Sequence, residues 1–141
     1  MTVIDSANII IETLPQRAEK RRLISICTPA LNEAENIEPC YQAVREFFER
    51  QAPQYDWEWV VTDNHSTDGT FDRLRVIAAG DPRVRGFRFS RNFGYQRSIL
   101  AGYLRARGDA AVQLDCDLED PPALIAEFLK RWEAGNQVVY G

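Results

Sequence analysis

The chain has 141 residues, of which 45% are hydrophobic and 27% are charged, a balance typical of one globular domain. Its 17 basic and 21 acidic residues give a net charge of −4, which argues against nucleic acid as a partner, because binding to a phosphate backbone needs a basic surface. With three cysteines, no Cys-x-x-Cys pair and one histidine, neither a disulfide framework nor a structural zinc site is expected, and a reducing, cytoplasmic compartment fits.

The two ends of the chain differ from its middle. Residues 1–21 contain only a short apolar run and lack the layout of a signal peptide, so we expect a partly disordered leader there. No stretch approaches the ~18 apolar residues that span a bilayer. Residues 22–141 are expected to form one domain, and the apolar run that ends the chain is typical of a core strand, which predicts a domain that is cut short.

Strand-like and helix-like segments alternate through residues 22–141. In chain order we expect strand 23–28, helix 36–51, strand 57–62, helix 66–79, strand 84–89, helix 94–107, strand 110–114, a helix between Pro121 and Gly135, and strand 138–140. The strands are short, apolar and β-branched, and the helices carry apolar residues at helical spacing. Short connections between alternating strands and helices predict an α/β fold, with a mainly parallel sheet and right-handed crossovers.

Local signals indicate where several elements begin and end. Pro29 is expected to stop the first strand, because proline lacks the N–H that a sheet ladder uses. Asn36 can cap the first helix, and Ser66 and Thr67 offer caps for the second. The helix expected at 94–107 carries four apolar residues: Ile99, Leu100, Tyr103 and Leu104.

Polar side chains follow the first four predicted strands. They are Asn32 and Glu33, then Asp63, Asn64 and Asp68, then Arg91 and Asn92, and finally Asp115, Asp117, Glu119 and Asp120. In parallel sheets of this kind, ligands bind beyond the carboxyl ends of the strands. Carboxylates gathered at one edge repel one another, so their collection there points to a function rather than to packing.

The acids after the fourth strand carry the strongest local signal. Alternate residues of an extended chain share one side, so Asp115, Asp117 and Glu119 are expected to converge on one point. Converging carboxylates need a cation, and oxygen ligands suit Mg²⁺ or Mn²⁺ bridged to substrate phosphates. The plainer alternative is a solvated acidic turn that caps the next helix. A haloacid dehalogenase-type phosphatase fits less well, because its Asp-x-Asp follows the first strand.

Two further clusters can hold a nucleoside. The backbone carbonyl left free at Pro29 can meet a nucleobase, Glu33 can bind a ribose hydroxyl, and Asp63 can accept a hydrogen bond from a base N–H. The plainer alternatives are a loop leading into a helix and a capped turn, with His65 as an exposed turn residue. A nucleotidyltransferase is disfavoured, because residues 28–36 contain no glycine and no basic residue for a phosphate loop.

Three ordered motifs carry a family resemblance: PALNE at 29–33, DNHSTDGT at 63–70 and DCD at 115–117. Together they resemble the family 2 glycosyltransferases with the GT-A (Rossmann-like) fold. SRNFGYQ at 90–96 and DCDLEDPP at 115–122 also resemble the polyprenyl-phosphate glycosyltransferases, including dolichyl-phosphate mannosyltransferase. The resemblance runs from about Arg22 to Gly141, nearly the whole chain.

This resemblance implies an inverting, metal-dependent glycosyltransferase of cell envelope biogenesis. It would move a sugar from a UDP- or GDP-sugar to a polyprenyl phosphate at the inner face of the membrane. The donor-binding residues implied are Pro29, Leu31, Glu33, Asp63, Asn64, Arg91, Asn92, Asp115 and Cys116, and the metal ligands are Asp115, Asp117 and Glu119. No catalytic base is assigned, because in the family it lies beyond the position of Gly141.

The chain departs from the family pattern in three places. Asn64-His65 replaces Asp-Gly, Tyr95 replaces a histidine, and Glu119 replaces a glutamine, so the donor stays open. A non-catalytic nucleotide-binding or assembly module stays open too, because half an active site can bind without turnover, and so does a saccharide acceptor. The sheet edge of a domain cut short would favour pairing of chains into a homo-oligomer.

Overall fold

The computed structural model describes residues 2–5, 8–11 and 20–141 of the chain. Within the first twenty residues, β1 (Thr2–Asp5) and β2 (Asn8–Ile11) pair as an antiparallel hairpin. The expectation of a partly disordered leader falls on residues 1, 6–7 and 12–19, which lie outside the described residues. The boundary between a leader and the domain therefore stays a prediction.

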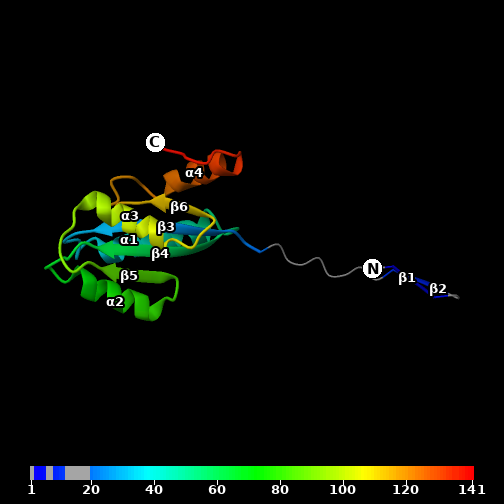
Figure 1. Ribbon diagram of the computed structural model, residues 1–141, viewed down its shortest axis with the longest axis horizontal. Helices are drawn as coiled ribbons and strands as arrows, with labels where there is room; N and C mark the ends of the chain where they lie inside the picture. Colours follow the sequence, from blue (N-terminus) through cyan, green and yellow to red (C-terminus); the bar gives the residue numbers. More distant parts are fainter. Residues whose placement is uncertain (1, 6–7, 12–19) are drawn as a thin grey trace.

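Four parallel strands form the sheet of the main body, in the order β5–β4–β3–β6 (Figure 1). They are β3 (Leu23–Ala30), β4 (Asp56–Asp63), β5 (Val84–Arg88) and β6 (Ala110–Gln113). Within this sheet, the inner strand β3 comes first in the sequence, β4 and β5 follow on one side of it, and the chain then crosses back to form β6 on the other side. This reversal of strand order opens a crevice outside the carboxyl ends of β3 and β6, where ligands bind in doubly wound sheets.

Helices cover both faces of this sheet: α1 (Ile37–Arg50), α2 (Thr70–Gly80), α3 (Tyr95–Arg105) and α4 (Ala123–Glu133). The aromatic core lies on the α1 face, where Phe48 stacks on Trp57 and Tyr41 on Trp59, at centroid distances of 5.5 and 6.0 Å. On the opposite face α3 packs against Cys27 and Thr62. Figure 1 shows α2 next to β5 and α4 next to β6, at the two edges of the sheet.

Contrary to the prediction, Pro29 does not end the first strand. It pairs in register with Thr62, and β3 continues to Ala30. In a parallel strand successive residues bond alternately to the two neighbours. Cys27 bonds toward β6 and Ala30 toward the β4 side, so the nitrogen of Pro29 points toward β6, beyond the last residue of that strand. No ladder hydrogen bond is lost there, so proline is tolerated.

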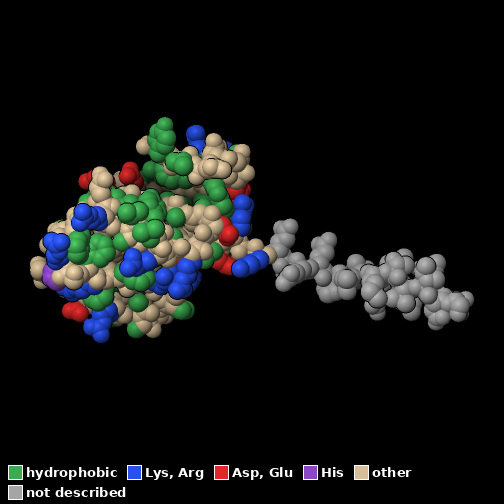
Figure 2. All heavy atoms as spheres, in the orientation of Figure 1, with side chains coloured by type: hydrophobic (Ala, Val, Ile, Leu, Met, Phe, Trp, Pro, Cys, Tyr) green, Lys and Arg blue, Asp and Glu red, His purple; other side chains and the backbone are tan. Residues whose placement is uncertain are grey.

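Helix α3 packs against the sheet with small residues rather than with the large apolar residues that it carries. Its buried residues are Ser98 and Gly102, whereas Leu100 and Leu104 are 55% and 76% exposed. A Cβ atom at Gly102 would lie 3.3 Å from the Cβ of Cys27, so the helix backbone lies close against the sheet. Small residues permit this approach, and the larger apolar side chains are turned outward. Figure 2 shows the resulting surface of hydrophobic side chains with Lys and Arg among them.

Two other predictions about elements are wrong. The second helix begins at Thr70, after Gly69 at a φ of 90°, rather than at Ser66 or Thr67. Residues 138–140 form no strand, so the parallel sheet has four strands among the described residues. Every other predicted boundary shifts by at most two residues. Across the described ranges, no helix is long and apolar enough to cross a membrane.

Candidate functional site

A pocket of about 280 Å³ lies at the carboxyl ends of the central strands, in the crevice created by the reversal of strand order. Of the residues predicted to form the site, those lining it are Pro29, Leu31, Glu33, Asn64, Asn92, Asp115, Cys116 and Asp117. The predicted residues that do not line it are Asp63, Arg91 and Glu119. Residues from all four polar clusters, which lie far apart in the sequence, therefore share one cavity.

Hydrogen bonds join the loop after β3 to the loop after β4. Asn32, at a φ of 54°, donates its backbone N–H to the Ser66 hydroxyl at 2.8 Å, and its side-chain oxygen accepts from the Thr67 N–H at 2.9 Å. The backbone N–H of Glu33 donates to the Thr70 hydroxyl at 2.8 Å. Ser66 and Thr67, expected to cap a helix, instead hold the loop after β3 against the site.

Asn64 joins the same site to the loop that precedes α3. Its amide nitrogen donates to the Asn92 side-chain oxygen at 2.8 Å, and its oxygen accepts from the Phe93 N–H at 2.8 Å. Asn92 accepts in turn from the Gly94 N–H, also at 2.8 Å. Asparagine at position 64 therefore uses both ends of its amide to order residues 92–94, a task that the family's aspartate, with no donor, could perform only in part.

Asp63 lies beneath the pocket rather than in its wall. Its side chain has no exposed surface, and its carboxylate accepts from the Ser66 N–H at 3.2 Å and lies 3.6 Å from Arg88 Nε. A base bound in the pocket would not reach this carboxylate without a rearrangement. Asp63 is therefore buried and outside the pocket lining in this structure, and its role as an acceptor for a base N–H stays a prediction.

The three acids predicted to converge do not form a cluster. The chain turns at Leu118, which has a φ of 58°, so the alternation of an extended segment is broken between Asp117 and Glu119. The Asp117 carboxylate accepts from the Glu119 N–H at 3.1 Å. No group of three or more His, Cys, Asp or Glu residues could hold a metal ion in the part of the chain that the structure describes.

Asp115 and Asp117 nevertheless line the same pocket, and two carboxylates are a sufficient donor set for one kind of cation site. Mg²⁺ is commonly held by one or two carboxylates, with substrate phosphates and water as its remaining ligands. The pair therefore fits an ion that arrives with a diphosphate. Glu119 does not belong to this set in the observed conformation.

Tyr95 is the contact that sequence reasoning missed. Its hydroxyl lies 2.8 and 3.0 Å from the two oxygens of Asp115, and Gln113 donates to the Tyr95 oxygen at 2.8 Å and to Asp115 at 3.2 Å. Burial, together with the hydrogen bond to Asp115, raises the pKa of Tyr95 to about 12, so its hydroxyl stays a donor. The only signal in the sequence was tyrosine in place of the family's histidine.

Two predicted residues lie at the margin of the site. Arg91 is exposed, and its guanidinium stacks over the Phe93 ring at 4.4 Å. His65 is an exposed turn residue, as predicted, with a φ of 68° and its Nδ1 at 3.1 Å from the Phe89 carbonyl oxygen. All three cysteines are buried and free, and Cys116 is 2% exposed, so the thiol of the Asp-Cys-Asp segment packs inward.

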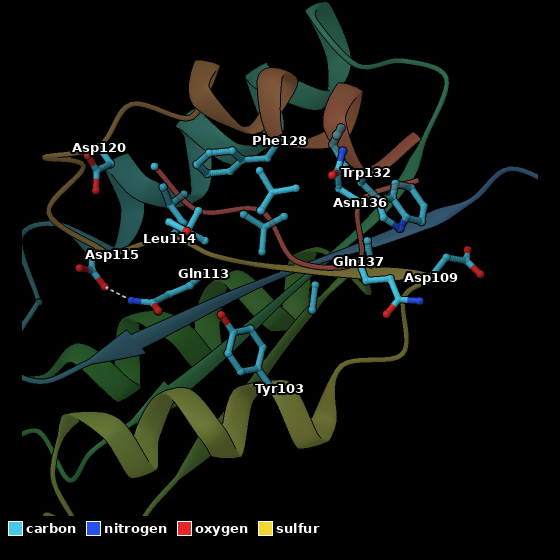
Figure 3. A pocket seen from close by; sticks show the side chains of 17 residues that line it. Tyr103, Asp109, Gln113, Leu114, Asp115, Asp120, Phe128, Trp132, Asn136 and Gln137 are labelled. Atoms are coloured by element: carbon cyan, nitrogen blue, oxygen red, sulfur yellow. Dashed lines mark hydrogen bonds between the residues drawn. The ribbon is translucent and has the colours of Figure 1, made fainter. Parts of the chain in front are cut away.

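A second, larger cavity of about 560 Å³ lies between the free edge of β6, Tyr103 of α3 and the apolar face of α4. Figure 3 shows Phe128 and Trp132 on one side of it, Tyr103 on the other, and Asp115 with Gln113 at one end. Asp115 lines both cavities. A molecule in the second cavity would therefore approach the first one at this carboxylate.

A comparison with protein families shows which family the chain belongs to. Residues 25–141 match the model for "Glycosyl transferase family 2". The chain belongs to glycosyl transferase family 2. The predicted family and the predicted GT-A fold are both confirmed, and the family consists of transferases that move sugars.

Relatives of this family 2 chain are found among bacterial and phage proteins. It is 40% identical over 116 residues to "Uncharacterized glycosyltransferase YkcC" of Bacillus subtilis, a match that covers 82% of this chain and 35% of the relative. It is 38% identical to "Bactoprenol glucosyl transferase" of Shigella phage SfV, with 82% and 37% covered. The chain thus spans about a third of the length of the curated relatives it matches.

Solved structures give the same fold. A mannosyltransferase, PcManGT from Pyrobaculum calidifontis in complex with GDP-Man and Mn²⁺, matches with a TM-score of 0.66 and 27% identity, over 85% of this chain and 34% of that one. S. aureus TarS 1–349 matches with a TM-score of 0.58 and 20% identity, over 79% of this chain and 31% of that one, which shows the fold alone.

Proposed function

We propose that this chain binds a nucleoside-diphosphate sugar in the 280 Å³ pocket and takes part in transferring the sugar, with inversion, to a polyprenyl phosphate. The observation that carries the proposal is the meeting of Pro29, Glu33, Asp115 and Asp117 in this one pocket, at the reversal of strand order. Relatives named bactoprenol glucosyl transferase, at 37–38% identity, support the acceptor class.

The nucleoside end of the donor belongs to the wall formed by the loop after β3. Leu31 is 42% exposed and offers an apolar surface to a base or ribose, and the Glu33 carboxylate can accept from a ribose hydroxyl. Asn64 and Asn92 form the floor beside it. We assign Asp63 an indirect part, because its buried carboxylate holds the Ser66 turn beneath the pocket.

The diphosphate end belongs to the part of the pocket formed by the segment after β6, where Asp115 and Asp117 would hold Mg²⁺ or Mn²⁺. An ion held there would neutralise charge on the departing diphosphate. The complex of PcManGT with GDP-Man and Mn²⁺ supports this choice of ligand and ion. Cys116 lies between the two ligands with its thiol packed inward, so its contribution to the site is through the backbone. We assign Arg91, on an exposed loop, a contact with phosphate from outside the pocket.

The transfer step needs few groups from this chain. An oxygen of the acceptor phosphate would attack the anomeric carbon, the bond from that carbon to the diphosphate would break, and the configuration would invert. Because a phosphate acceptor is already anionic, no residue described here is required to remove a proton. The reaction would take place at the inner face of the cell membrane, where a lipid-linked acceptor lies.

Calorimetric titration of UDP and GDP, with Mn²⁺ and with EDTA, tests the donor site. We expect binding of one nucleotide that Mn²⁺ strengthens, and an Asp117→Asn variant in which the gain from Mn²⁺ falls at least tenfold, the size that ligand-shell changes produce. Glu119→Gln is the matched control and should leave binding unchanged. Equal affinity in Mn²⁺ and in EDTA would contradict the proposal.

Transfer of radiolabelled sugar to a polyprenyl phosphate separates an enzyme from a non-catalytic module. Transfer by the full-length protein, lost in Asp117→Asn, is the expected result. Metal-dependent nucleotide binding without transfer to a polyprenyl phosphate or to a saccharide would favour the binding module.

A further inference from the structure

Asp115 is held before any ligand binds, whereas Asp117 is not held in the same way. The Tyr95 hydroxyl contacts both oxygens of the Asp115 carboxylate, at 2.8 and 3.0 Å, and Gln113 donates to the nearer oxygen at 3.2 Å. Within the described part of the chain, the Asp117 carboxylate accepts one hydrogen bond, from the backbone N–H of Glu119. Two side chains, Tyr95 at the start of α3 and Gln113 at the end of β6, thus set the orientation of a single carboxylate, that of Asp115.

The fold fixes Tyr95 at the position from which it reaches Asp115. It is the first residue of α3 and follows Gly94, whose φ of 92° and ψ of 159° suit only glycine. The Gly94 N–H donates to Asn92, which is tied to Asn64 at the end of β4. The orientation of the tyrosine is therefore set by a hydrogen-bonded loop rather than by free rotation of a surface side chain.

Such a contact matters for a cation ligand because an exposed carboxylate otherwise rotates. Two ionised oxygens offer about four acceptor positions, so the tyrosine and glutamine donors leave positions free for an ion. Hydrogen-bond partners of metal-binding side chains orient them, and their loss typically weakens metal affinity 10- to 100-fold. Tyr95 lines the same pocket as both carboxylates and is 52% exposed, so it lies where this orientation is needed.

We propose that Tyr95, supported by Gln113, is a positioning residue that presents the Asp115 carboxylate to the cation of the donor site. This inference rests on the proposed function of the same pocket. The group of Tyr95 that this role requires is its hydroxyl, as a hydrogen-bond donor, and not its aromatic ring.

Three variants of the full chain test the proposal by calorimetric titration of Mn²⁺ in the presence of UDP or GDP, and of the nucleotide in EDTA. Tyr95→Phe keeps the ring and removes the donor, and should weaken Mn²⁺ binding about tenfold while nucleotide affinity in EDTA stays unchanged. Tyr95→His supplies a ring N–H donor that ends closer to the backbone than the tyrosine hydroxyl, so it should recover at most a small part of the loss. Tyr103→Phe, on the same helix but without a contact to Asp115, is the matched control and should behave as the unaltered chain.

Each other outcome has a definite meaning. If the unaltered chain binds Mn²⁺ with the nucleotide and Tyr95→Phe binds it equally well, the positioning role is overturned and the proposed function stands. A loss in Tyr95→Phe that is the same in Mn²⁺ and in EDTA also overturns it, because the tyrosine would then contact the nucleotide or support the pocket wall. An unaltered chain that shows no Mn²⁺-dependent binding overturns the proposed function and this inference together.

Discussion

Two buried aspartates lie near the two ends of α2 and stabilise the loops there. Asp63, before the helix, holds the Ser66 turn, and Asp81, after it, accepts from the Tyr41 hydroxyl at 2.8 Å and from Arg83 at 2.7 and 2.9 Å. Arg83 also lies over the Trp57 ring at 4.1 Å. A carboxylate bound by several donors in a buried position belongs to the structure, so acidic residues near a strand end are not by themselves evidence of a ligand site.

The contacts of Asp81 predict an acid-sensitive contribution to stability. Hydrogen bonds from Arg83 lower the pKa of Asp81 below its ordinary value of 3.8 by more than burial raises it. A carboxyl group with a lowered pKa in the folded state stabilises the fold above its unfolded pKa and loses that contribution as the pH falls below it. Asp81→Asn should therefore cost about 2 kcal/mol of unfolding free energy at pH 7, and less near pH 3, where part of the contribution is lost; the rest is lost only as the pH falls through the lower, folded pKa.

Urea unfolding of the two proteins between pH 3 and pH 7 measures this difference. Asp72→Asn is a suitable control, because Asp72 is exposed and lies 3.9 Å from Arg75, so its loss should change little at any pH. A difference between Asp81→Asn and the unaltered protein that stays constant with pH would contradict the prediction.

Helix α3 illustrates how an element can be predicted while its packing is not. Its apolar residues recur at helical spacing, yet the face against the sheet consists of Ser98 and Gly102. The Ser98 hydroxyl donates to the Thr62 carbonyl at 3.1 Å, and Gly102 permits the close approach to Cys27. This close packing positions the first residue of the helix, Tyr95, over the site.

Filling the space at Gly102 should push α3 off the sheet. A Cβ atom there would lie 3.3 Å from the Cβ of Cys27, and the branched side chain of Gly102→Val would add two methyl groups to that crowded contact. We expect a loss of about 1–3 kcal/mol in unfolding free energy, typical of overpacked sites. Thermal or urea unfolding measures it, with Leu104→Ser, at a 76% exposed position, as a control that should stay within about 0.5 kcal/mol. An unchanged stability in Gly102→Val would show that the helix can shift freely.

At the scale of the whole molecule, the strands of the parallel sheet differ in how they are paired. The two middle strands, β3 and β4, are paired on both sides, whereas β6, next to the second cavity, is paired on one side. β3 pairs with β4 and β6, whereas the outer edge of β6 has no partner strand among the described residues. In a parallel ladder the amides of a strand point alternately to its two neighbours, so an edge strand leaves about half of them without a ladder partner. The 560 Å³ cavity and the Asp115 carboxylate lie along this free edge.

Hydrogen exchange should therefore differ between neighbouring strands of the same sheet. We expect amides of β3 to exchange slowest, and amides of β6 to exchange faster although the two strands are paired. Exchange followed by NMR or mass spectrometry would test this. Equal protection of β6 would mean that its outer edge is covered in solution, and a molecular mass of twice the chain would then identify the cover as a second copy, as expected of a homo-oligomer.

The sequence by itself determined the alternation of strands and helices, the parallel sheet and the gathering of polar residues at strand ends. These features depend on local periodicity and on turn residues, so they can be read from short windows such as 23–30 or 115–122. Only the tertiary structure decided that Leu118 turns the chain and separates Glu119 from Asp115, and that Asp63 is buried while Asn64 faces the pocket. The contact of Tyr95 with Asp115 joins segments 20 residues apart, beyond the reach of a short sequence window. The positive φ of Leu118 and the close packing of α3 on the sheet also leave no trace in a hydrophobic pattern.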